Sequence, residues 1–376
     1  MDTLADDPAG SLCLRDLIAR YVPADGAPLP ASGHTLARWR LLATVAHDHG
    51  AVAGKLFESH LDALAIIAEI AGVPPAPPAP HRAGASLASP APAMGGATHA
   101  THGCWAVWAA EPPFAAVDAT PLPDSEAAAC ASSRDALSAT TGGRAHARLT
   151  PVRLNGRKAW CSGAREVTHA LMTCRDAEGA RRLAVVDMRA AGIAVTDEGW
   201  EAVGMRATHS GDVCFADTPA LLLGDADAYL RRPGFWHGGA GIAACWYGAV
   251  LPFAEALHAG LRRRPDPHGA AHLGDIDGQL RAAAALLRET ATWIDTHPVA
   301  DAMPHAIRVR TVVEAAVQHT LRHAGNALGA GPLCRDRRLA ACYADLPVFL
   351  RQSHAERDLA ALGEALGAGT TEEWKL

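Results

Sequence analysis

A chain of 376 residues, with 49% apolar and 20% charged residues, is globular rather than disordered and too long for one small core. The net charge is -6 and Lys and Arg form no dense run, so we expect no nucleic-acid partner. No apolar run reaches membrane-spanning length, and the N-terminus is acidic where a signal peptide would be basic. The sequence therefore predicts a cytoplasmic protein without a membrane partner.

The N-terminal part is predicted to be helical. The apolar segment from Leu12 to Tyr21 indicates a short helix, and the apolar positions from Thr35 to Ala71 keep largely to one face of a long helix. Val73 to Gly96 carries seven prolines, which a helix interior does not tolerate, so we interpret it as an extended connector. We place the first domain at residues 1–98.

The pattern changes to short β runs in a second predicted domain, residues 99–225. No helical period separates these runs, which indicates an antiparallel sandwich or barrel. Pro121 to Gly143 is polar and alanine-rich and is predicted to be a loop or a short helix. The runs are Cys104–Ala109, Arg148–Leu154, Lys158–Cys161, Ala170–Cys174, Leu183–Met188, Ile193–Thr196 and Asp212–Phe215.

The helical period returns in a third predicted domain, residues 226–376. Four long amphipathic helices with short connections indicate a four-helix bundle. They span Ile242–Leu261, Leu273–Ile294, Ile307–Leu328 and Leu339–Leu362. The expected fold is therefore α+β, with an N-terminal helical domain, a middle antiparallel β domain and a C-terminal four-helix bundle.

Cysteine and histidine patterns predict neither disulfides nor a metal site. Nine cysteines are scattered along the chain without a CxxC pair, which is typical of free, mostly buried thiols. The 19 histidines include the pairs His47/His49 and His99/His102, but neither pair matches HExxH or a zinc ribbon. We therefore expect solvated or core histidines.

One stretch of the middle domain, Leu154 to Ala164, reads LNGRKAWCSGA. Asn155 and Gly156 predict a tight hairpin turn, because both residue types tolerate positive φ. Trp160 and Ser162 follow, and an aromatic ring beside a hydroxyl suits a flat heteroaromatic ligand. Taken alone, the pattern also fits a hairpin whose Trp160 packs into a β core.

Two further stretches accompany it: Trp105 to Pro112, WAVWAAEP, and Val203 to Phe215, VGMRATHSGDVCF. In order and spacing the three stretches resemble the acyl-CoA dehydrogenase family, in which a TEP strand, a GxKxWITNG hairpin and a GxRxTxSxxVxF strand form a β domain that holds FAD. The resemblance implies an FAD-dependent oxidoreductase that acts on an acyl substrate such as a CoA thioester. It also implies a homodimer or homotetramer that pairs through its bundles.

The resemblance assigns roles to particular residues of this chain. Trp160 and Ser162 fall where the family contacts the flavin ring, with the hydroxyl near the reactive flavin nitrogen. Ala109 and Ala110 fall where the strand backbone covers the other side of the ring. Leu56 to His60, LFESH, lies where many members carry SH or H near the acyl-binding side.

The chain departs from the family around the rest of the cofactor. The Gly and Ser that follow TEP in the family help to hold the pyrophosphate, and here Pro113 to Asp118, PFAAVD, replaces them. The RxxFG segment, which reaches FAD from a neighbouring subunit, becomes Arg262 to His268. Cofactor binding is therefore inferred mainly from the face of the sheet.

The largest departure concerns the catalytic base. Many family members carry a Glu in RDARLxxIYEGT, and the matching RDRRLAACYADL places Ala344 at that position. Asp345 is adjacent and is our candidate base, although it also precedes Leu346-Pro347, where it would cap a new helix. Glu255 is a second candidate acid, and His354 is a candidate in a branch of the family that binds reduced flavin and activates oxygen.

Three hypotheses follow. The first is an acyl-CoA dehydrogenase-like oxidoreductase with FAD between the β domain and the bundle. The second is a flavin-dependent monooxygenase on the same fold, which the missing Glu favours. The third is a binding or scaffold protein that keeps the fold and has lost the chemistry.

Overall fold

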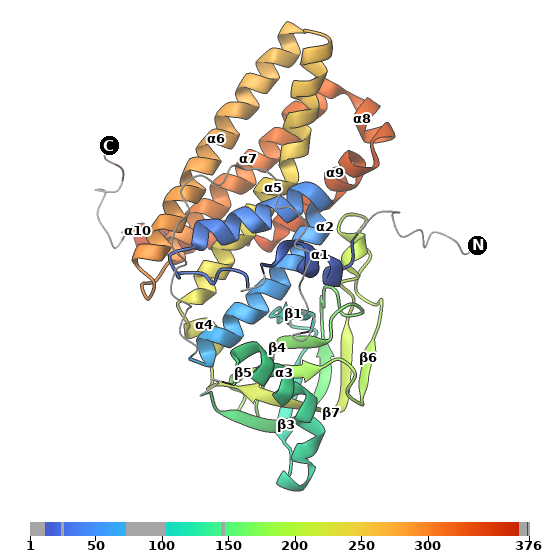
Figure 1. Cartoon of the computed structure of the whole chain (residues 1–376), viewed down its shortest axis with the longest axis vertical. Helices are drawn as coiled ribbons and strands as arrows, with labels where there is room; N and C mark the ends of the chain where they lie inside the picture. Colours follow the sequence, from blue (N-terminus) through green and yellow to red (C-terminus); the bar gives the residue numbers. More distant parts are fainter. Residues whose placement is uncertain (1–11, 24–25, 73–102, 144–146, 368–373, 375–376) are drawn as a thin grey trace, which may run out of the picture.

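The computed structural model describes residues 12–23, 26–72, 103–143, 147–367 and 374, and it contains both predicted N-terminal helices (Figure 1). Helix α1 spans Leu14–Tyr21 and helix α2 spans Thr35–Ile70. Gly50 interrupts α2 with a φ of 89°, which glycine adopts without a Cβ penalty, so α2 bends there. The predicted connector at 73–96, the boundary near residue 98 and the pair His99/His102 lie outside the described residues.

The middle region is a β barrel. The sequence predicted a sandwich or a barrel, and the structure contains the barrel. Strand β4 pairs with β2 and β5, β5 pairs with β7, and β7 pairs through β3 back to β2, so the sheet closes on itself. The pairings of β1 and β2 with β4 are parallel, and the others are antiparallel as predicted. The strands are β1 Trp105–Trp108, β2 Val117–Pro121, β3 Leu149–Lys158, β4 His169–Arg175, β5 Arg181–Asp187, β6 Ile193–Val195 and β7 Val213–Leu223.

The segment predicted as a loop or short helix contains more structure than the sequence indicated. Its first residue, Pro121, is the last residue of strand β2, which the sequence analysis missed because the alternation of β2 covers only five residues. The 3-10 helix η2, Asp124–Cys130, and helix α3, Ala131–Thr141, follow.

Asn155 and Gly156 form a bulge inside β3, so the predicted hairpin turn is wrong. Strand β3 continues through both residues, and its register with β7 shifts between Leu154 and Gly156. Gly156 has a φ of 127°, and a Cβ there would lie 2.3 Å from the carbonyl oxygen of Ala116. The glycine therefore permits a close approach of two strands rather than a reversal of the chain.

The C-terminal region contains three long helices that match the prediction: α5 Gly234–Arg263, α6 Pro267–Thr296 and α7 Met303–Leu328. They follow α4, Ala228–Arg231. The turn between α5 and α6 holds the segment that resembles RxxFG, and there the side chain of Asp266 caps α6 by accepting from the Gly269 amide.

The fourth predicted helix is divided into shorter ones. After α8, Ala330–Arg335, come α9, Arg337–Phe349, the 3-10 helix η4, Leu350–Gln352, and α10, Glu356–Gly367. Ser353 is extended and Ala355 has a φ of 45°, so the chain leaves helical geometry between α9 and α10. Helix α9 continues through Pro347, so the prediction that Asp345 caps a new helix is wrong.

Helices α2 and α5 pack together through small residues. A Cβ added to Gly248 of α5 would lie 2.1 Å from the carbonyl oxygen of Ala43 in α2, so only glycine allows this approach. Within the described residues, α5 is the one helix long and apolar enough to span a bilayer, and 72% of its most apolar window is buried inside the protein. Helix α5 is therefore a core helix of the fold.

Helix α2 also covers the free edge of β1. The backbone amide of Trp105 donates to Nδ1 of His60 at 3.1 Å, and the amide of Val107 donates to Oγ of Ser59 at 2.9 Å. These side chains satisfy alternate amides of an edge strand and fix the barrel against the helix.

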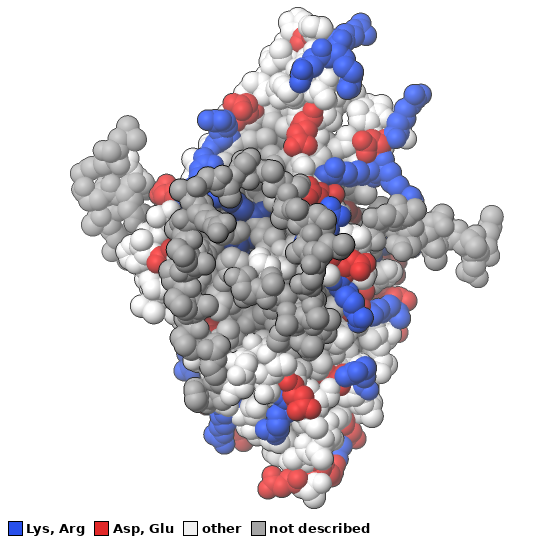
Figure 2. Space-filling view, in the orientation of Figure 1, with Lys and Arg blue, Asp and Glu red and all other residues white. Residues whose placement is uncertain are grey.

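Charged groups of both signs are mixed on the surface. On the face shown in Figure 2, Lys and Arg are interspersed with Asp and Glu over the bundle and the barrel. A mixed surface provides no single-sign field there of the kind that binds a phosphate backbone.

Candidate functional site

The predicted flavin-contacting residues meet in one cavity of about 750 Å³. Ala109, Ala110, Trp160 and Ser162 all line it, together with side chains from α2, the bundle and the segment after α9. A cavity of this size accepts a cofactor-sized ligand, because ligand pockets typically measure about 300–1,000 Å³. The structure thus brings the predicted residues together, and their contact with flavin stays a prediction.

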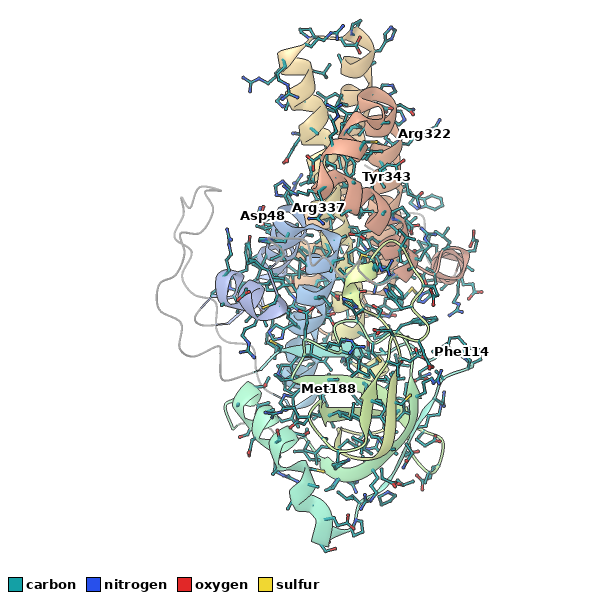
Figure 3. All side chains as sticks on the ribbon, turned by 90° about the vertical axis from the view of Figure 1, so that its right-hand side faces the viewer. Asp48, Phe114, Met188, Arg322, Arg337 and Tyr343 are labelled. Atoms are coloured by element: carbon teal, nitrogen blue, oxygen red, sulfur yellow. The ribbon has the colours of Figure 1, made fainter. Side chains whose placement is uncertain are left out.

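Trp160 stands in the wall of this cavity in a strained conformation. Its φ is 57°, which a non-glycine residue adopts at a cost of about 1–3 kcal/mol. The side chain is 44% exposed, and the edge of Phe114 contacts it with ring centroids 5.8 Å apart. Figure 3 shows Phe114 projecting from the β domain. The alternative in which Trp160 packs into a β core is therefore wrong.

Backbone and indole hydrogen bonds join the three predicted stretches. The amide of Cys161 donates to the carbonyl of Gly211 at 2.9 Å. The indole Nε1 of Trp108 donates to the carbonyl of Ser162 at 3.1 Å. Segments separated by about fifty residues in sequence thus share one rigid wall, which fixes the position of Ser162.

A chain of hydroxyl groups leads from Ser162 into the protein. The hydroxyl oxygens of Ser162 and Ser210 are 2.7 Å apart, and those of Ser210 and Thr208 are also 2.7 Å apart. Thr208 donates to the carbonyl of Met205 at 2.7 Å, and a carbonyl can only accept.

The carbonyl fixes the direction of every proton in the hydroxyl chain. Because each hydroxyl has one proton, Thr208 has none left for Ser210, so Ser210 donates to Thr208. By the same argument Ser162 donates to Ser210. Ser162 therefore presents only lone pairs to the cavity, and it accepts a hydrogen bond from whatever ligand lies there.

Asp345, the candidate base, does not line the cavity. Its Oδ1 accepts a hydrogen bond from the backbone amide of Met205 at 2.5 Å. Burial raises the pKa of Asp345, and the bond from Met205 opposes that rise. The side chain of Asp345 thus fixes Met205, whose carbonyl is the last acceptor of the hydroxyl chain. The role of Asp345 as a catalytic base stays a prediction.

Ala344 lies against the same loop. A Cβ on Gly204 would be 1.9 Å from the carbonyl oxygen of Ala344, so the loop backbone packs directly on α9. This close approach explains why Asp345 meets Met205 rather than the cavity.

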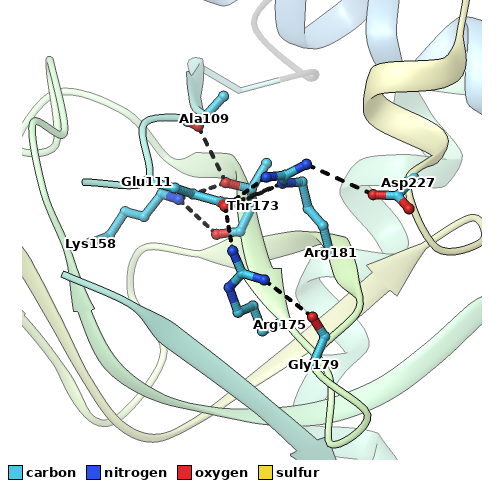
Figure 4. A network of polar contacts seen from close by, with 8 residues as sticks. All are labelled: Ala109, Glu111, Lys158, Thr173, Arg175, Gly179, Arg181 and Asp227. Carbon is cyan, nitrogen blue, oxygen red and sulfur yellow. Dashed lines mark hydrogen bonds and ion pairs between the residues drawn. The ribbon is translucent and has the colours of Figure 1, made fainter. Parts of the chain in front are cut away.

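Glu111 anchors the end of β1 through two arginines (Figure 4). Arg181 binds its carboxylate through Nε and Nη2 at 3.1 Å, and Arg175 reaches it at 3.1 Å. Burial alone would raise the pKa of Glu111, but the hydrogen bonds from Arg181 and Thr173 lower it. The carboxylate therefore stays charged and holds Ala109 and Ala110 in the cavity wall.

Lys158 supports the same segment from inside the barrel. Its Nζ donates to the carbonyl of Thr173 at 2.8 Å and to its hydroxyl at 2.7 Å. Burial lowers the pKa of Lys158 to about 8, and Glu111 partly opposes this shift. Thr173 in turn lies 3.5 Å from the carbonyl of Ala109, which completes the network drawn in Figure 4.

Glu58 is a carboxylate of the cavity that the sequence analysis did not identify. It lies on α2 and pairs with Lys55 at 3.0 Å. Burial raises the pKa of Glu58 to about 7, so the group can exchange a proton near neutral pH. The sequence signals were an acid between Phe57 and Ser59 within an apolar helical run, and its place in the LFESH stretch, which the resemblance put near the acyl-binding side.

The other two candidates lie in different places. His354 lines the cavity, is 60% exposed at its side chain and contacts Asp358 at 3.3 Å through Nδ1. Glu255 lies outside the cavity lining and contacts Nε2 of His47 at 3.0 Å. Of the histidines that the structure describes, only His354 lines the cavity.

One family model matches much of the barrel. Residues 128–218 match the family described as acyl-CoA dehydrogenase, middle domain. No curated protein matches the chain.

Three solved structures share most of the architecture. TdsC from Paenibacillus sp. A11-2, in complex with FMN and indole, is 18% identical with a TM-score of 0.66, over 86% of this chain and 81% of its own. A nitrososynthase from Micromonospora carbonacea var. africana is 18% identical with a TM-score of 0.63, over 94% and 87%. KijD3, with FMN and a dTDP-sugar, is 18% identical with a TM-score of 0.62, over 90% and 80%.

Identities at this level show the fold alone, and they support the arrangement of helices around a middle β region. The family match to the middle domain covers Trp160 and Ser162 and most of the barrel. The resemblance predicted from the sequence is thereby confirmed, and the chain has the acyl-CoA dehydrogenase-like flavoprotein fold.

Proposed function

We propose that this protein is a flavin-dependent monooxygenase that binds reduced flavin and oxygenates a small apolar molecule. The observation that carries the proposal is the direction of the hydroxyl chain, which leaves Ser162 as an acceptor at the cavity. Reduced flavin carries a proton on its reactive nitrogen, whereas oxidised flavin presents a lone pair there. An acceptor at this position therefore selects the reduced form.

The residues around the cavity fit a flavin. The exposed ring of Trp160 offers a face for stacking, and the fixed backbone of Ala109 and Ala110 offers polar groups opposite it. Bound reduced flavin would supply the two electrons that reduce one oxygen atom of O₂ to water while the other enters the substrate. The side chains of this chain would orient both molecules and exclude water.

One part of the remaining wall favours an aromatic or otherwise apolar substrate. Trp200, Phe235, Trp236 and Ile242 line it. TdsC, named a dibenzothiophene monooxygenase, has been solved with indole in its structure, and a similar ligand class suits this wall. Glu58 and His354 would hold or move protons beside such a substrate.

We propose FMN as the cofactor in place of the FAD that the sequence resemblance implied. The family's Gly-Ser segment for the pyrophosphate is replaced here by a segment that contains Phe114, which is 68% exposed. Both TdsC and KijD3 have been solved with FMN. We retain the cytoplasm as the proposed location, where reductases supply reduced flavin.

Oxygen incorporation tests the proposal directly. Purified protein, reduced FMN, indole and ¹⁸O₂ should give a product that carries one labelled oxygen atom per molecule. Free reduced FMN without protein is the control, because it reacts with oxygen unaided. If the protein binds reduced FMN and all of the indole is recovered without labelled oxygen, the proposed monooxygenase activity is contradicted.

Acyl-CoA dehydrogenation is the second candidate, and Glu58 favours it as a carboxyl group in the cavity with a pKa near neutrality. This reading predicts that octanoyl-CoA bleaches the bound oxidised flavin without oxygen and that Glu58→Gln abolishes the bleaching. Absence of flavin binding in either redox state would favour the scaffold hypothesis.

We also propose that the chain forms a homodimer or homotetramer through its bundle, as the sequence resemblance implied. Light scattering at micromolar concentration should give a mass of two or four chains. A monomer would contradict this proposal and would remove the neighbour that completes the cofactor site in the resembled family.

A further inference from the structure

Helices α6 and α7 bring a group of imidazoles and a carboxylate together, away from the cavity. The group consists of His272 and Asp275 on α6 and His319 and His323 on α7. Residues three or four apart share one face of a helix, so each helix turns two of these side chains toward the other helix. The two helices run side by side in the upper part of Figure 1, and Figure 3 labels Arg322, which precedes His323 in the sequence.

The candidate ligand atoms converge on one point. The ligand atoms of Asp275, His319 and His323 all lie within 4.8 Å of one another. Oδ2 of Asp275 is 3.2 Å from Nε2 of His319 and 3.1 Å from Nδ1 of His323. Four ligands at about 2.0–2.1 Å from a tetrahedral zinc ion would be roughly 3.3–3.4 Å apart, which is close to these separations.

His272 supplies a fourth candidate ligand. Its Nδ1 lies 3.1 Å from Nδ1 of His323, the same atom that contacts Asp275. Nδ1 of His323 carries either one proton or one lone pair. It therefore cannot make well-aligned hydrogen bonds to His272 and Asp275 at the same time. A cation that binds Nδ1 of His323 would remove this conflict, because a cation accepts lone pairs from several ligands.

One ring nitrogen of His319 lacks a hydrogen-bond partner among the described residues. Its Nε2 is buried and makes no hydrogen bond within the described residues, although it lies beside Asp275. An unpaired buried polar atom is costly, and a bound cation would remove the cost.

The two imidazoles on α7 lie parallel, and solvent can reach the carboxylate beside them. The rings of His319 and His323 stack at 4.0 Å with an interplanar angle of 16°, and each has a ring nitrogen next to Oδ2 of Asp275. The side chain of Asp275 is 48% exposed, which gives an ion a path from solvent.

We propose that Asp275, His319 and His323 form a zinc site, with His272 as the fourth ligand, that joins α6 to α7. Two or three imidazoles and one carboxylate form a ligand set that Zn²⁺ accepts. The site holds the two helices together near the end of the bundle, and it is independent of the proposed flavin chemistry.

Zinc titration of untagged, chelator-treated protein against a chromophoric competitor tests the site. The wild type should bind one Zn²⁺ per chain, and His319→Ala/His323→Ala should weaken binding by at least about 100-fold, since even outer partners of metal ligands are worth 10- to 100-fold. Asp275→Asn should weaken it less. His297→Ala, at the opposite end of α6, is the matched control and should bind as the wild type does.

Cobalt provides a second measurement. Co²⁺ added in place of zinc should show the visible absorption of a four-coordinate ion in the wild type and lose it in the double variant. Circular dichroism should show that the double variant remains folded, because the side chains of His319 and His323 are only partly buried and lie outside the apolar core. Zinc uptake that is equal in the wild type and the double variant, or no uptake in the wild type, would overturn the proposal.

Discussion

Ser162→Ala is expected to weaken the binding of reduced FMN by about 5- to 150-fold and to leave the binding of oxidised FMN nearly unchanged. The variant leaves the protonated flavin nitrogen without its acceptor, and an unpaired buried donor costs about 1–3 kcal/mol. Oxidised flavin presents a lone pair to the lone pairs of Ser162, so it loses no favourable contact. Anaerobic titration by flavin fluorescence and absorbance measures both affinities.

The direction of the hydroxyl chain can be changed from a distance. Thr208→Val removes the hydroxyl that donates to the Met205 carbonyl, with little change in side-chain volume. Ser210 then loses its acceptor, and Ser162 becomes free to donate to an oxidised flavin. The ratio of reduced to oxidised affinity should therefore fall, although Thr208 does not line the cavity.

Thr218→Val is the matched control. Thr218 is a fully buried threonine of β7 whose hydroxyl makes no hydrogen bond within the described residues. The same substitution there should leave the affinity ratio unchanged. An unchanged ratio in both Ser162→Ala and Thr208→Val would show that the chain does not select the flavin redox state.

The elements with a strong period were predictable from the sequence. Helices α2, α5, α6 and α7 follow from apolar residues repeated over many turns, and the strands with buried cores follow from short apolar runs. The break between α9 and α10 depends on the positive φ of Ala355, an alanine that carries no local signal for it. The bulge at Gly156 depends on contact with another strand, which a local reading of Asn-Gly does not contain.

The site was predictable only in part, and for a related reason. The three stretches that form the cavity wall share an order and spacing with a known family, so the sequence predicted that Ala109, Ala110, Trp160 and Ser162 lie together, and their contact with flavin stays a prediction. Glu58 and the group around His323 were missed, because their neighbours come from other helices. The contact of Asp345 with Met205 joins residues 140 positions apart, and only packing of α9 on the barrel creates it.

Asp345→Leu is expected to lower the free energy of unfolding by about 1–3 kcal/mol, because it leaves the buried amide of Met205 without an acceptor. Met205 has a φ of 56°, so its conformation needs that support. Loss of the bond should also loosen the Met205 carbonyl and reduce the preference of the cavity for reduced flavin. Asp345→Asn keeps an acceptor oxygen and is the matched control.

The pH dependence separates the charge of Asp345 from its hydrogen bond. Burial raises the pKa of Asp345 above its unfolded value, so its contribution to stability is fully present below the unfolded pKa of about 3.9 and is lost as the pH rises through the folded pKa. The free energy of unfolding of Asp345→Asn should therefore equal that of the wild type near pH 4, and at pH 7 it should be at least as large. Chemical denaturation at both pH values measures the difference. If Asn proves as damaging as Leu at pH 7, the fold requires the ionised carboxylate itself and not only an acceptor oxygen.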